Sequence, residues 1–407
     1  MSSRDRNGLF AVKPKENKDE NDGANKRSLS GKLKLPQDPL TRGLIIMIIL
    51  VLLFAVIGMV IYGKRHMFDG YDTVSSIPRE DAEGMQFEML GKTLIKYGHD
   101  GVFAQDLSGN ILWSSAYSMQ TPMSSVNGRI MILYEQLGTR VYILNEGGIT
   151  GTYQVALPIR SGTVGKNGVA ALILDDKAEM HIDLYTASGS QIASVKATLD
   201  ETGYPLDAAL SGNSEQLIVS YMALENGKLT GKNVIYDFSG SGGTEGDHIG
   251  AAFSCGETVF PDVYFRENGE SVAVGDNRFV VYSSGRKPVQ KADVPLEKEI
   301  VSCFYDDSSI GFIFPDTDTE NRYEIATYSY RGRQRSSGSF NYEYKDVMMD
   351  RGEVLLYDSG NIYSYRRSGL AKLAAPYEKE VVYFRKLGGS RKYLVITPES
   401  TDQISIR

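Results

Sequence analysis

The hydrophobic pattern divides the chain into one long apolar run and many short ones. Residues Leu44–Tyr62 (LIIMIILVLLFAVIGMVIY) contain no charged residue over nineteen positions. A bilayer core about 30 Å thick requires roughly 20 apolar residues in a helix, and the apolar core of a cleaved signal peptide is shorter, about 7–15 residues. The run therefore predicts an uncleaved signal-anchor helix over 44–62. We expect a disordered tail over 1–43, a short linker over 63–70 and an extracytoplasmic domain over 71–407.

Positive charges are unevenly distributed around this run. The twenty residues before it contain five Lys or Arg residues, and the twenty after it contain three. Because basic flanks tend to stay in the cytoplasm, we expect a single-pass cell-membrane protein with its N-terminus inside and its large domain outside. The basic residues either fix this topology alone or also contact anionic headgroups. The predicted membrane-surface contacts are Lys32, Lys34, Arg42, Lys64 and Arg65.

Net charge separates the tail from the rest of the chain. Residues 1–43 carry +4 and the remaining residues carry −11, within a total of −7. An acidic extracytoplasmic domain argues against nucleic acid as a partner, because nucleic-acid binders usually present a basic face. The expected partners are the lipid bilayer and a protein or an anionic cell-envelope polymer.

Short apolar runs recur along the large domain. Eight of them start within a span of 300 residues, a mean spacing of about 43, which is typical of a four-stranded propeller blade. A second series, which alternates apolar with polar residues, follows the first. Continuous apolar runs suit strands buried on both faces and alternation suits half-exposed strands, so the series predict the second and third strands of each blade. The apolar runs are Thr93–Tyr97, Ile130–Tyr134, Val169–Leu174, Leu217–Met222, Ser271–Val274, Ile310–Phe314, Val354–Tyr357 and Tyr393–Thr397. The alternating runs are Val102–Leu107, Val141–Asn145, His181–Tyr185, Val234–Phe238, Phe279–Ser283, Tyr323–Tyr330, Ile362–Tyr365 and Ile404–Arg407.

The turns and the last run determine how many blades are expected. A Gly-containing turn follows seven of the eight alternating runs. Glycine supplies the positive φ that tight hairpins require. An outer strand such as Ile111–Ser115 then follows the turn. The eighth run leaves its blade with an open edge, which proteins avoid. We expect Tyr71–Ile77 (YDTVSSI) to close that blade. The prediction is an all-β, eight-bladed β-propeller, with a seven-bladed ring or a pair of β-sandwiches as alternatives.

One segment resembles a known propeller repeat. Val102–Trp113 (VFAQDLSGNILW) resembles the repeat of quinoprotein-like, PQQ-repeat-like propellers, in which a strand leads through a Gly turn to Leu-Trp. The plan of basic tail, single span and tandem strands is similar to an uncharacterised bacterial family of signal-anchored membrane proteins. The chain departs from quinoproteins because Trp113 is its only Trp. Quinone-cofactor enzymes of this fold also use adjacent cysteines, whereas Cys255 and Cys303 are 48 residues apart, so we predict no cofactor.

No sequence motif indicates a catalytic or metal site. No histidine has another His, Cys or carboxylate at the spacing of metal ligands, and a nucleophile elbow of the Gly-x-Ser-x-Gly type does not occur. The Gly-rich Ser239–Gly250 is expected to be a flexible blade insertion, and Asp316–Glu320 a hairpin loop rather than a calcium loop. The expected register places the two cysteines two blades apart, which favours free buried thiols over a disulfide. The four histidines are His66, His99, His181 and His248.

The most basic patch outside the tail interleaves arginine with aromatic residues. Arg and Tyr are enriched at binding hot spots, and Arg matches the geometry of carboxylate and phosphate groups. The alternative is that these arginines only protect a solvated strand edge. The predicted ligand-binding residues are Tyr328, Tyr330, Arg331, Arg333 and Arg335.

The sequence therefore favours a non-enzymatic binding or scaffold module for protein or cell-envelope ligands. A cell-envelope hydrolase or lyase, with its site at the propeller channel, is one alternative. A transmembrane sensor is the other.

Overall fold

The structure, a computed structural model, divides into a helical unit and a β-sheet unit. The units are Met1–Lys64 and Arg65–Arg407. Helix α1 (Pro39–Arg65) contains the apolar run that the sequence analysis identified. In the part of the chain that the structure describes, no helix has both the length and the apolar character needed to cross a membrane. The described residues are 39–81, 84–177, 179–240, 248–317 and 320–407, without the side chains of 39, 41–42 and 59–64.

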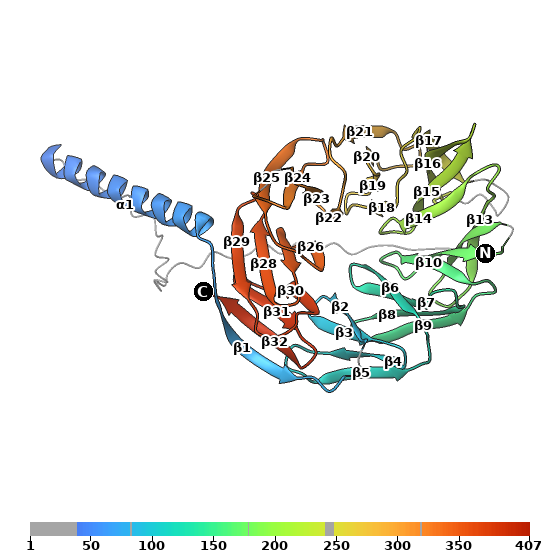
Figure 1. Ribbon diagram of the computed structural model, residues 1–407, viewed down its shortest axis with the longest axis horizontal. Coiled ribbons are helices and arrows are strands. Elements are labelled where there is room, and N and C mark those ends of the chain that lie inside the picture. The colour runs from blue at the N-terminus through green and yellow to red at the C-terminus, as the bar shows by residue number, and fades with distance from the viewer. Residues whose placement is uncertain (1–38, 82–83, 178, 241–247, 318–319) are drawn as a thin grey trace, which may run out of the picture. The chain divides into compact units, whose positions relative to one another are not determined.

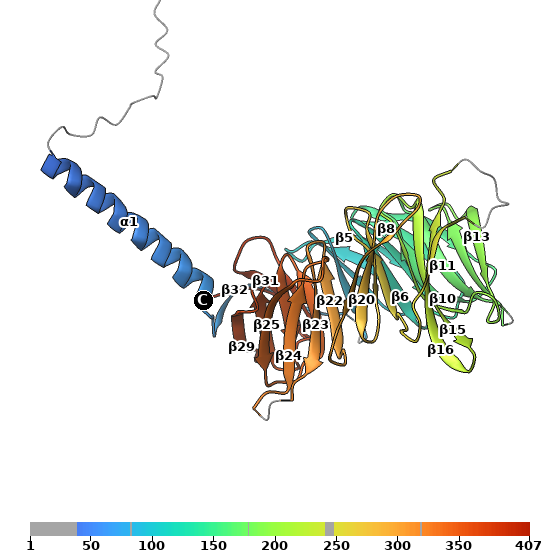
Figure 2. The same ribbon diagram turned by 90° about the horizontal axis from the view of Figure 1, so that it is seen from above.

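The β-sheet unit is a ring of eight four-stranded antiparallel sheets, counted over the described residues (Figure 1). Turned by 90°, the ring is seen edge-on (Figure 2). From inner to outer strand, the first four blades are β2 (Gln86–Leu90), β3 (Thr93–Tyr97), β4 (Gly101–Gln105), β5 (Ile111–Ala116); β6 (Pro122–Asn127), β7 (Ile130–Glu135), β8 (Arg140–Asn145), β9 (Gly148–Gln154); β10 (Ile159–Val164), β11 (Ala170–Asp175), β12 (Met180–Tyr185), β13 (Gln191–Ala197); and β14 (Tyr204–Leu210), β15 (Gln216–Glu225), β16 (Lys228–Asp237), β17 (Ile249–Ser254). The last four are β18 (Asp262–Phe265), β19 (Ser271–Val274), β20 (Arg278–Tyr282), β21 (Gln290–Pro295); β22 (Ser302–Asp306), β23 (Ser309–Pro315), β24 (Tyr323–Tyr328), β25 (Gln334–Phe340); β26 (Asp346–Asp350), β27 (Glu353–Tyr357), β28 (Asn361–Arg366), β29 (Ala371–Pro376); and β30 (Tyr383–Lys386), β31 (Lys392–Ile396), β32 (Ser400–Ile406), β1 (Tyr71–Pro78).

Burial follows the two sequence series. The second strands β3 and β27 are buried at every position, whereas the outer strand β5 alternates between exposed and half-buried side chains. Blades of a propeller pack face to face, so their second strands are covered on both sides. The apolar core accordingly forms clusters shared by neighbouring blades, such as the one that unites Ile182 of β12 with Leu217 of β15. The eight-bladed prediction is confirmed, and the seven-bladed and sandwich alternatives are wrong.

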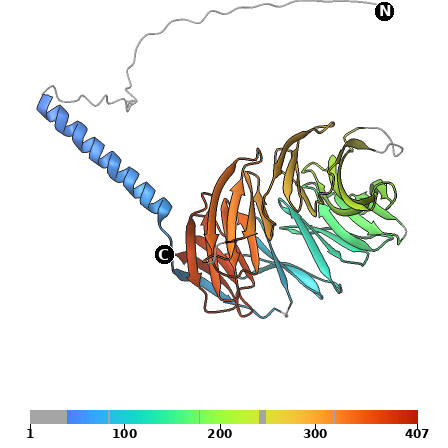
Figure 3. The ribbon, with the colours of Figure 1, turned by 45° about the horizontal axis from the view of Figure 1, so that its top comes forward.

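The ring closes where the sequence analysis expected. Strand β1 pairs antiparallel with β32, from Tyr71 opposite Ile406 to Pro78 opposite Ser400, and Figure 3 shows the blue strand beside the red blade. The carboxylate of Asp402 in β32 accepts hydrogen bonds from Ser76 of β1 at 2.5 Å and from Tyr377 at 2.6 Å. Segments from both ends of the β-sheet unit therefore complete one blade.

Among the described residues, the turns that join first to second strands lie on one face of the ring, together with the turns that join third to fourth strands. This arrangement follows from the antiparallel order of each sheet. Adjacent blades contact each other here: Gln216, which follows the β14–β15 turn, donates to the carbonyl of Gly285 in the β20–β21 turn at 2.6 Å. We call this the turn face.

Candidate functional site

A groove between the fifth and sixth blades gathers most of the predicted binding residues. Its cavity has a volume of about 1070 Å³. The wall on the fifth blade comes from β18–β21, and the wall on the sixth blade comes from the β24–β25 turn. We call it the arginine groove. It is lined by Arg266, Asn268, Glu270, Val281, Lys291, Ser308, Ser329, Tyr330, Arg331, Arg333, Gln334 and Arg335.

The β24–β25 turn fixes how the arginines project. The amide of Gly332 donates to the carbonyl of Ser329 at 2.9 Å, and the amide of Ser329 donates to the carbonyl of Arg333 at 2.8 Å. Gly332 has a φ of +82°, and a Cβ there would lie 2.8 Å from Cγ2 of Val294. Only glycine fits this position without strain, so the turn is tight and its flanking arginines point away from the core.

The two predicted tyrosines lie beneath the surface. Tyr330 is only 6% exposed; its hydroxyl donates to the carbonyl of Asp306 at 2.6 Å and lies 3.0 Å from the hydroxyl of Tyr264. The guanidinium of Arg266 lies 4.0 Å from the centre of the Tyr330 ring, and burial raises the pKa of Tyr330. Tyr328 is half-buried, with its ring 6.0 Å from that of Phe312. Tyr330 therefore forms the floor of the groove, and Tyr328 belongs to the core.

The charges of the groove are strongly unbalanced. Glu270 is 9% exposed and pairs with both Arg266 and Lys291. Burial favours its neutral form, but hydrogen bonds from Lys291 and Asn268 outweigh burial and lower its pKa. The remaining three cations are exposed and form no ion pair within the described residues: they are Arg331, Arg333 and Arg335. Five cations thus face one carboxylate.

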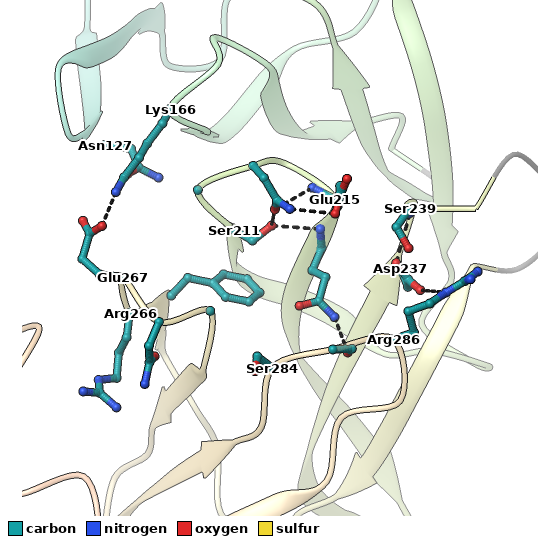
Figure 4. Close-up of a pocket in the computed structure, with 17 residues that line it drawn as sticks. Asn127, Lys166, Ser211, Glu215, Asp237, Ser239, Arg266, Glu267, Ser284 and Arg286 are labelled. Atoms are coloured by element: carbon teal, nitrogen blue, oxygen red, sulfur yellow. Dashed lines mark hydrogen bonds and ion pairs between the residues drawn. The ribbon is translucent and has the colours of Figure 1, made fainter. Parts of the chain in front are cut away.

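A second groove adjoins the first across the β18–β19 turn, and Figure 4 shows the residues that line it. Its cavity has a volume of about 600 Å³, and Arg266 and Asn268 line both grooves. Its cations Lys166 and Arg286 pair with Glu267 and Asp237, so we call it the neutral groove. It is lined by Asn127, Lys166, Ser211, Gly212, Asn213, Glu215, Gln216, Asp237, Ser239, Phe265, Arg266, Glu267, Asn268, Gly269, Ser284, Gly285 and Arg286.

Two carboxylates on adjacent inner strands form a third notable group. Burial raises the pKa of Asp207 in β14 to about 6, although the amide of Val263 donates to this carboxylate at 2.9 Å. Burial, together with the charge of Asp207, raises the pKa of Asp262 in β18 to about 7. Sequence reasoning missed both residues because nothing in their local sequence indicates that two blades bring them close together.

Within the described part of the chain, the structure also assembles one group of metal-ligand type that sequence reasoning did not find. Ligand atoms of Asp176, Glu179 and His181 all lie within 4.8 Å of one another at the β11–β12 turn. Lys196 lies 3.2 Å from Glu179 and already pairs with that carboxylate. The three residues lie three and two positions apart across the β11–β12 hairpin, and the folded turn brings their ligand atoms together.

The other predicted residues are located as follows. Lys32 and Lys34 lie outside the described residues, as do the side chains of Arg42 and Lys64, whereas Arg65 is exposed. Both thiols are free, which confirms that prediction, although they are half-buried rather than buried. Burial raises the pKa of Cys255 and of Cys303, so both remain protonated at neutral pH.

Comparisons with known proteins agree with the fold. Sqt1 from Chaetomium thermophilum is 10% identical with a TM-score of 0.53, over 83% of this chain and 98% of that one. The same protein bound to the N-terminus of the ribosomal protein L10 is 11% identical with a TM-score of 0.51, over 83% and 99%. Such low identity shows the fold alone.

Sequence comparison gives the family. No curated protein matches the chain. The quinoprotein-like character of the repeat stays a prediction. Residues 64–406 match the model of DUF5711, a family of unknown function, and the chain belongs to that family.

Proposed function

We propose that this protein is a non-enzymatic binding module that holds an anionic ligand in the arginine groove. One observation carries the proposal: Arg331, Arg333 and Arg335 are exposed, lack ion-pair partners among the described residues and line one cavity. A charge-assisted hydrogen bond contributes about 1.5–3 kcal/mol, and the planar guanidinium suits carboxylate and phosphate oxygens. The ligand is a polymer or a protein segment that carries such groups.

The groove differs from a merely solvated strand edge. Protective arginines on an edge strand need only point into water. Here the three arginines face a second wall that carries Lys291 and Arg266, and Arg266 is fixed by hydrogen bonds from its Nη2 and Nε to the carbonyl of Asp307 at 2.6 and 3.1 Å. Because Arg266 is already held in place, a ligand that binds it does not have to order that side chain.

We also propose that residues 44–62 anchor this module in the cell membrane, with the N-terminus in the cytoplasm. The nineteen uncharged residues of Leu44–Tyr62 and the excess of basic residues before them support this. Alkaline extraction of membranes should leave the protein in the pellet. Protease added to spheroplasts should remove a C-terminal tag and spare an N-terminal one. Release of the protein at alkaline pH would contradict the anchor.

Binding to poly-L-glutamate tests the main proposal, with the full chain in nanodiscs of uncharged lipid. The double variant R333E/R335E should bind about 100-fold more weakly, because two charge-assisted contacts become repulsive. The matched control is K92E/K392E, which reverses two exposed charges without ion-pair partners in the described residues, on the turn face of blades one and eight. Equal affinity of the two double variants, or no binding by the wild type, would overturn the proposal.

A second candidate function is cleavage of a cell-envelope polymer at the ring centre, by a hydrolase or a lyase reaction. One observation favours it. Asp207 and Asp262 have raised pKa values of about 6 and about 7, the range in which a carboxyl group can act as a general acid near neutral pH. Incubation with isolated envelope polymers should then release fragments, and D262N should abolish the release. Absence of cleavage between about pH 5 and 8 would exclude this candidate.

A further inference from the structure

We infer that the anionic ligand is a glycan, whose charged groups bind in the arginine groove while a neutral sugar unit occupies the adjoining neutral groove. This inference rests on the proposed function and specifies its ligand. It follows from the charge balance, the free hydrogen-bonding groups and the shared wall of the two grooves.

The ion pairs of the neutral groove argue against a second anionic group as its occupant. Three cations and three carboxylates line it. Lys166 pairs with Glu267, and Nε of Arg286 lies 3.0 Å from Oδ2 of Asp237. An anionic ligand group would have to displace a carboxylate from Lys166 or Arg286, whereas an uncharged polar group would not.

The uncharged lining suits a hydroxylated ring. The side chains of Asn127 and Ser284 come from blades two and five and make no hydrogen bond within the described residues, so their polar groups are available to a ligand. Phe265 supplies an aromatic surface in the same cavity. Sugars present hydroxyl groups at their rim and apolar C–H groups on their faces, which match polar side chains and an aromatic ring. Asparagine and serine can each donate or accept, as hydroxyl groups require.

Contiguity links the two grooves into one site. Arg266 and Asn268 line both cavities, so only the β18–β19 turn separates them. The side chain of Asn268 donates to Glu270 at 3.0 Å, and this contact holds the dividing wall in place. A polymer that alternates anionic and neutral units can therefore place neighbouring units on the two sides of the turn.

The test measures the affinity of two probes for the full chain, as the wild type and as one variant in which a bulky side chain fills the neutral groove. One probe is an oligosaccharide that alternates glucuronate with N-acetylglucosamine. The other is poly-L-glutamate, which carries the same carboxylates without sugar. S284W places a bulky side chain in the neutral groove, and S108W, at an exposed serine in the equivalent turn of blade one, is its matched control.

We expect S284W to weaken glycan binding about ten-fold, because the variant should lose one or two hydrogen bonds and an aromatic contact to the sugar. Polyglutamate binding should change less than about two-fold, since S284W leaves the arginine groove intact. S108W should leave both affinities unchanged, and thermal unfolding should verify that both variants are folded. N127A removes a polar side chain without filling the neutral groove, and it should also weaken glycan binding selectively.

The outcomes separate this inference from the proposed function. If S284W and N127A bind the glycan as the wild type does, while R333E/R335E loses both probes, the glycan inference fails and the anion-binding function stands. Equal weakening of both probes by S284W would also overturn the inference. Failure of both probes to bind the wild type would overturn the two together.

Discussion

The arginine groove and the neutral groove share a wall but differ in how far their charged side chains are paired. In the neutral groove, Lys166 and Arg286 are paired with Glu267 and Asp237, carboxylates that come from other blades. In the arginine groove, Glu270 neutralises only part of the charge of Arg266 and Lys291, and three further arginines remain. Paired charges link different blades, whereas the unpaired charges are the ones to which the proposed function assigns a ligand. The comparison suggests that function in this ring depends on which charges the fold leaves unpaired.

Removal of the floor of the arginine groove should have the largest effect on stability. Tyr330 is 6% exposed and hydrogen-bonded, so Y330A should lower the free energy of unfolding by about 3–5 kcal/mol. The half-buried Phe265 of the neutral groove provides the comparison, and F265A should cost about half as much. Urea denaturation measures both. If F265A lowered the free energy of unfolding more than Y330A did, the buried floor would not be what distinguishes the two grooves.

Neutralisation of Glu270 should weaken the fold and strengthen anion binding. E270Q leaves Arg266 and Lys291 without their carboxylate, which should cost about 2 kcal/mol at pH 7 and raise the affinity for polyglutamate several-fold.

The effect of Glu270 on stability should depend on pH. Because the folded-state pKa of Glu270 is lowered, its stabilising effect is present above the usual pKa of glutamate and is lost as the pH falls through the folded value. The stability difference between wild type and E270Q should therefore shrink on acidification. E225Q, at an exposed glutamate without an ion pair in the described residues, is the control. A difference that grew on acidification would show that the folded-state pKa of Glu270 is raised rather than lowered.

Much of this comparison could be predicted from the sequence, but not all of it. Periodicity alone predicted the blades, and the unassigned Tyr71–Ile77 predicted the closing strand, since both depend on local hydrophobic pattern. The run from Tyr328 to Arg335 identified one wall of the arginine groove. The opposite wall, with Lys291 and Glu270, could not be predicted, because it lies on another blade and its contacts depend on how the sheets pack. Tyr330 was expected as a ligand contact because sequence does not distinguish a buried ring from an exposed one.

Added salt should show how much of the affinity for polyglutamate comes from the exposed arginines. Exposed charge–charge attraction is screened by ions, so the affinity for polyglutamate should fall steeply with added NaCl in the wild type. In R333S/R335S the dependence should be distinctly shallower, while K92S/K392S should behave as the wild type. The measurement is a titration at several NaCl concentrations. Parallel slopes in all three proteins would mean that the arginines are not the contact residues.

The smallest effect should come from breaking the pair between Lys166 and Glu267 in the neutral groove. These side chains are 40% and 62% exposed, and exposed ion pairs contribute about 0–1 kcal/mol. Hydrogen bonds from backbone amides hold the same loops: the amide of Lys166 donates to the carbonyl of Gly212 at 3.0 Å, and the amide of Glu267 donates to Oδ1 of the Asp307 carboxylate at 2.7 Å. K166M should therefore change the free energy of unfolding by less than about 1 kcal/mol and polyglutamate affinity by less than about two-fold. A larger loss of stability would mean that the ion pair, rather than the backbone, holds blades three and five together, and paired charge would then be essential to the ring rather than merely compatible with it.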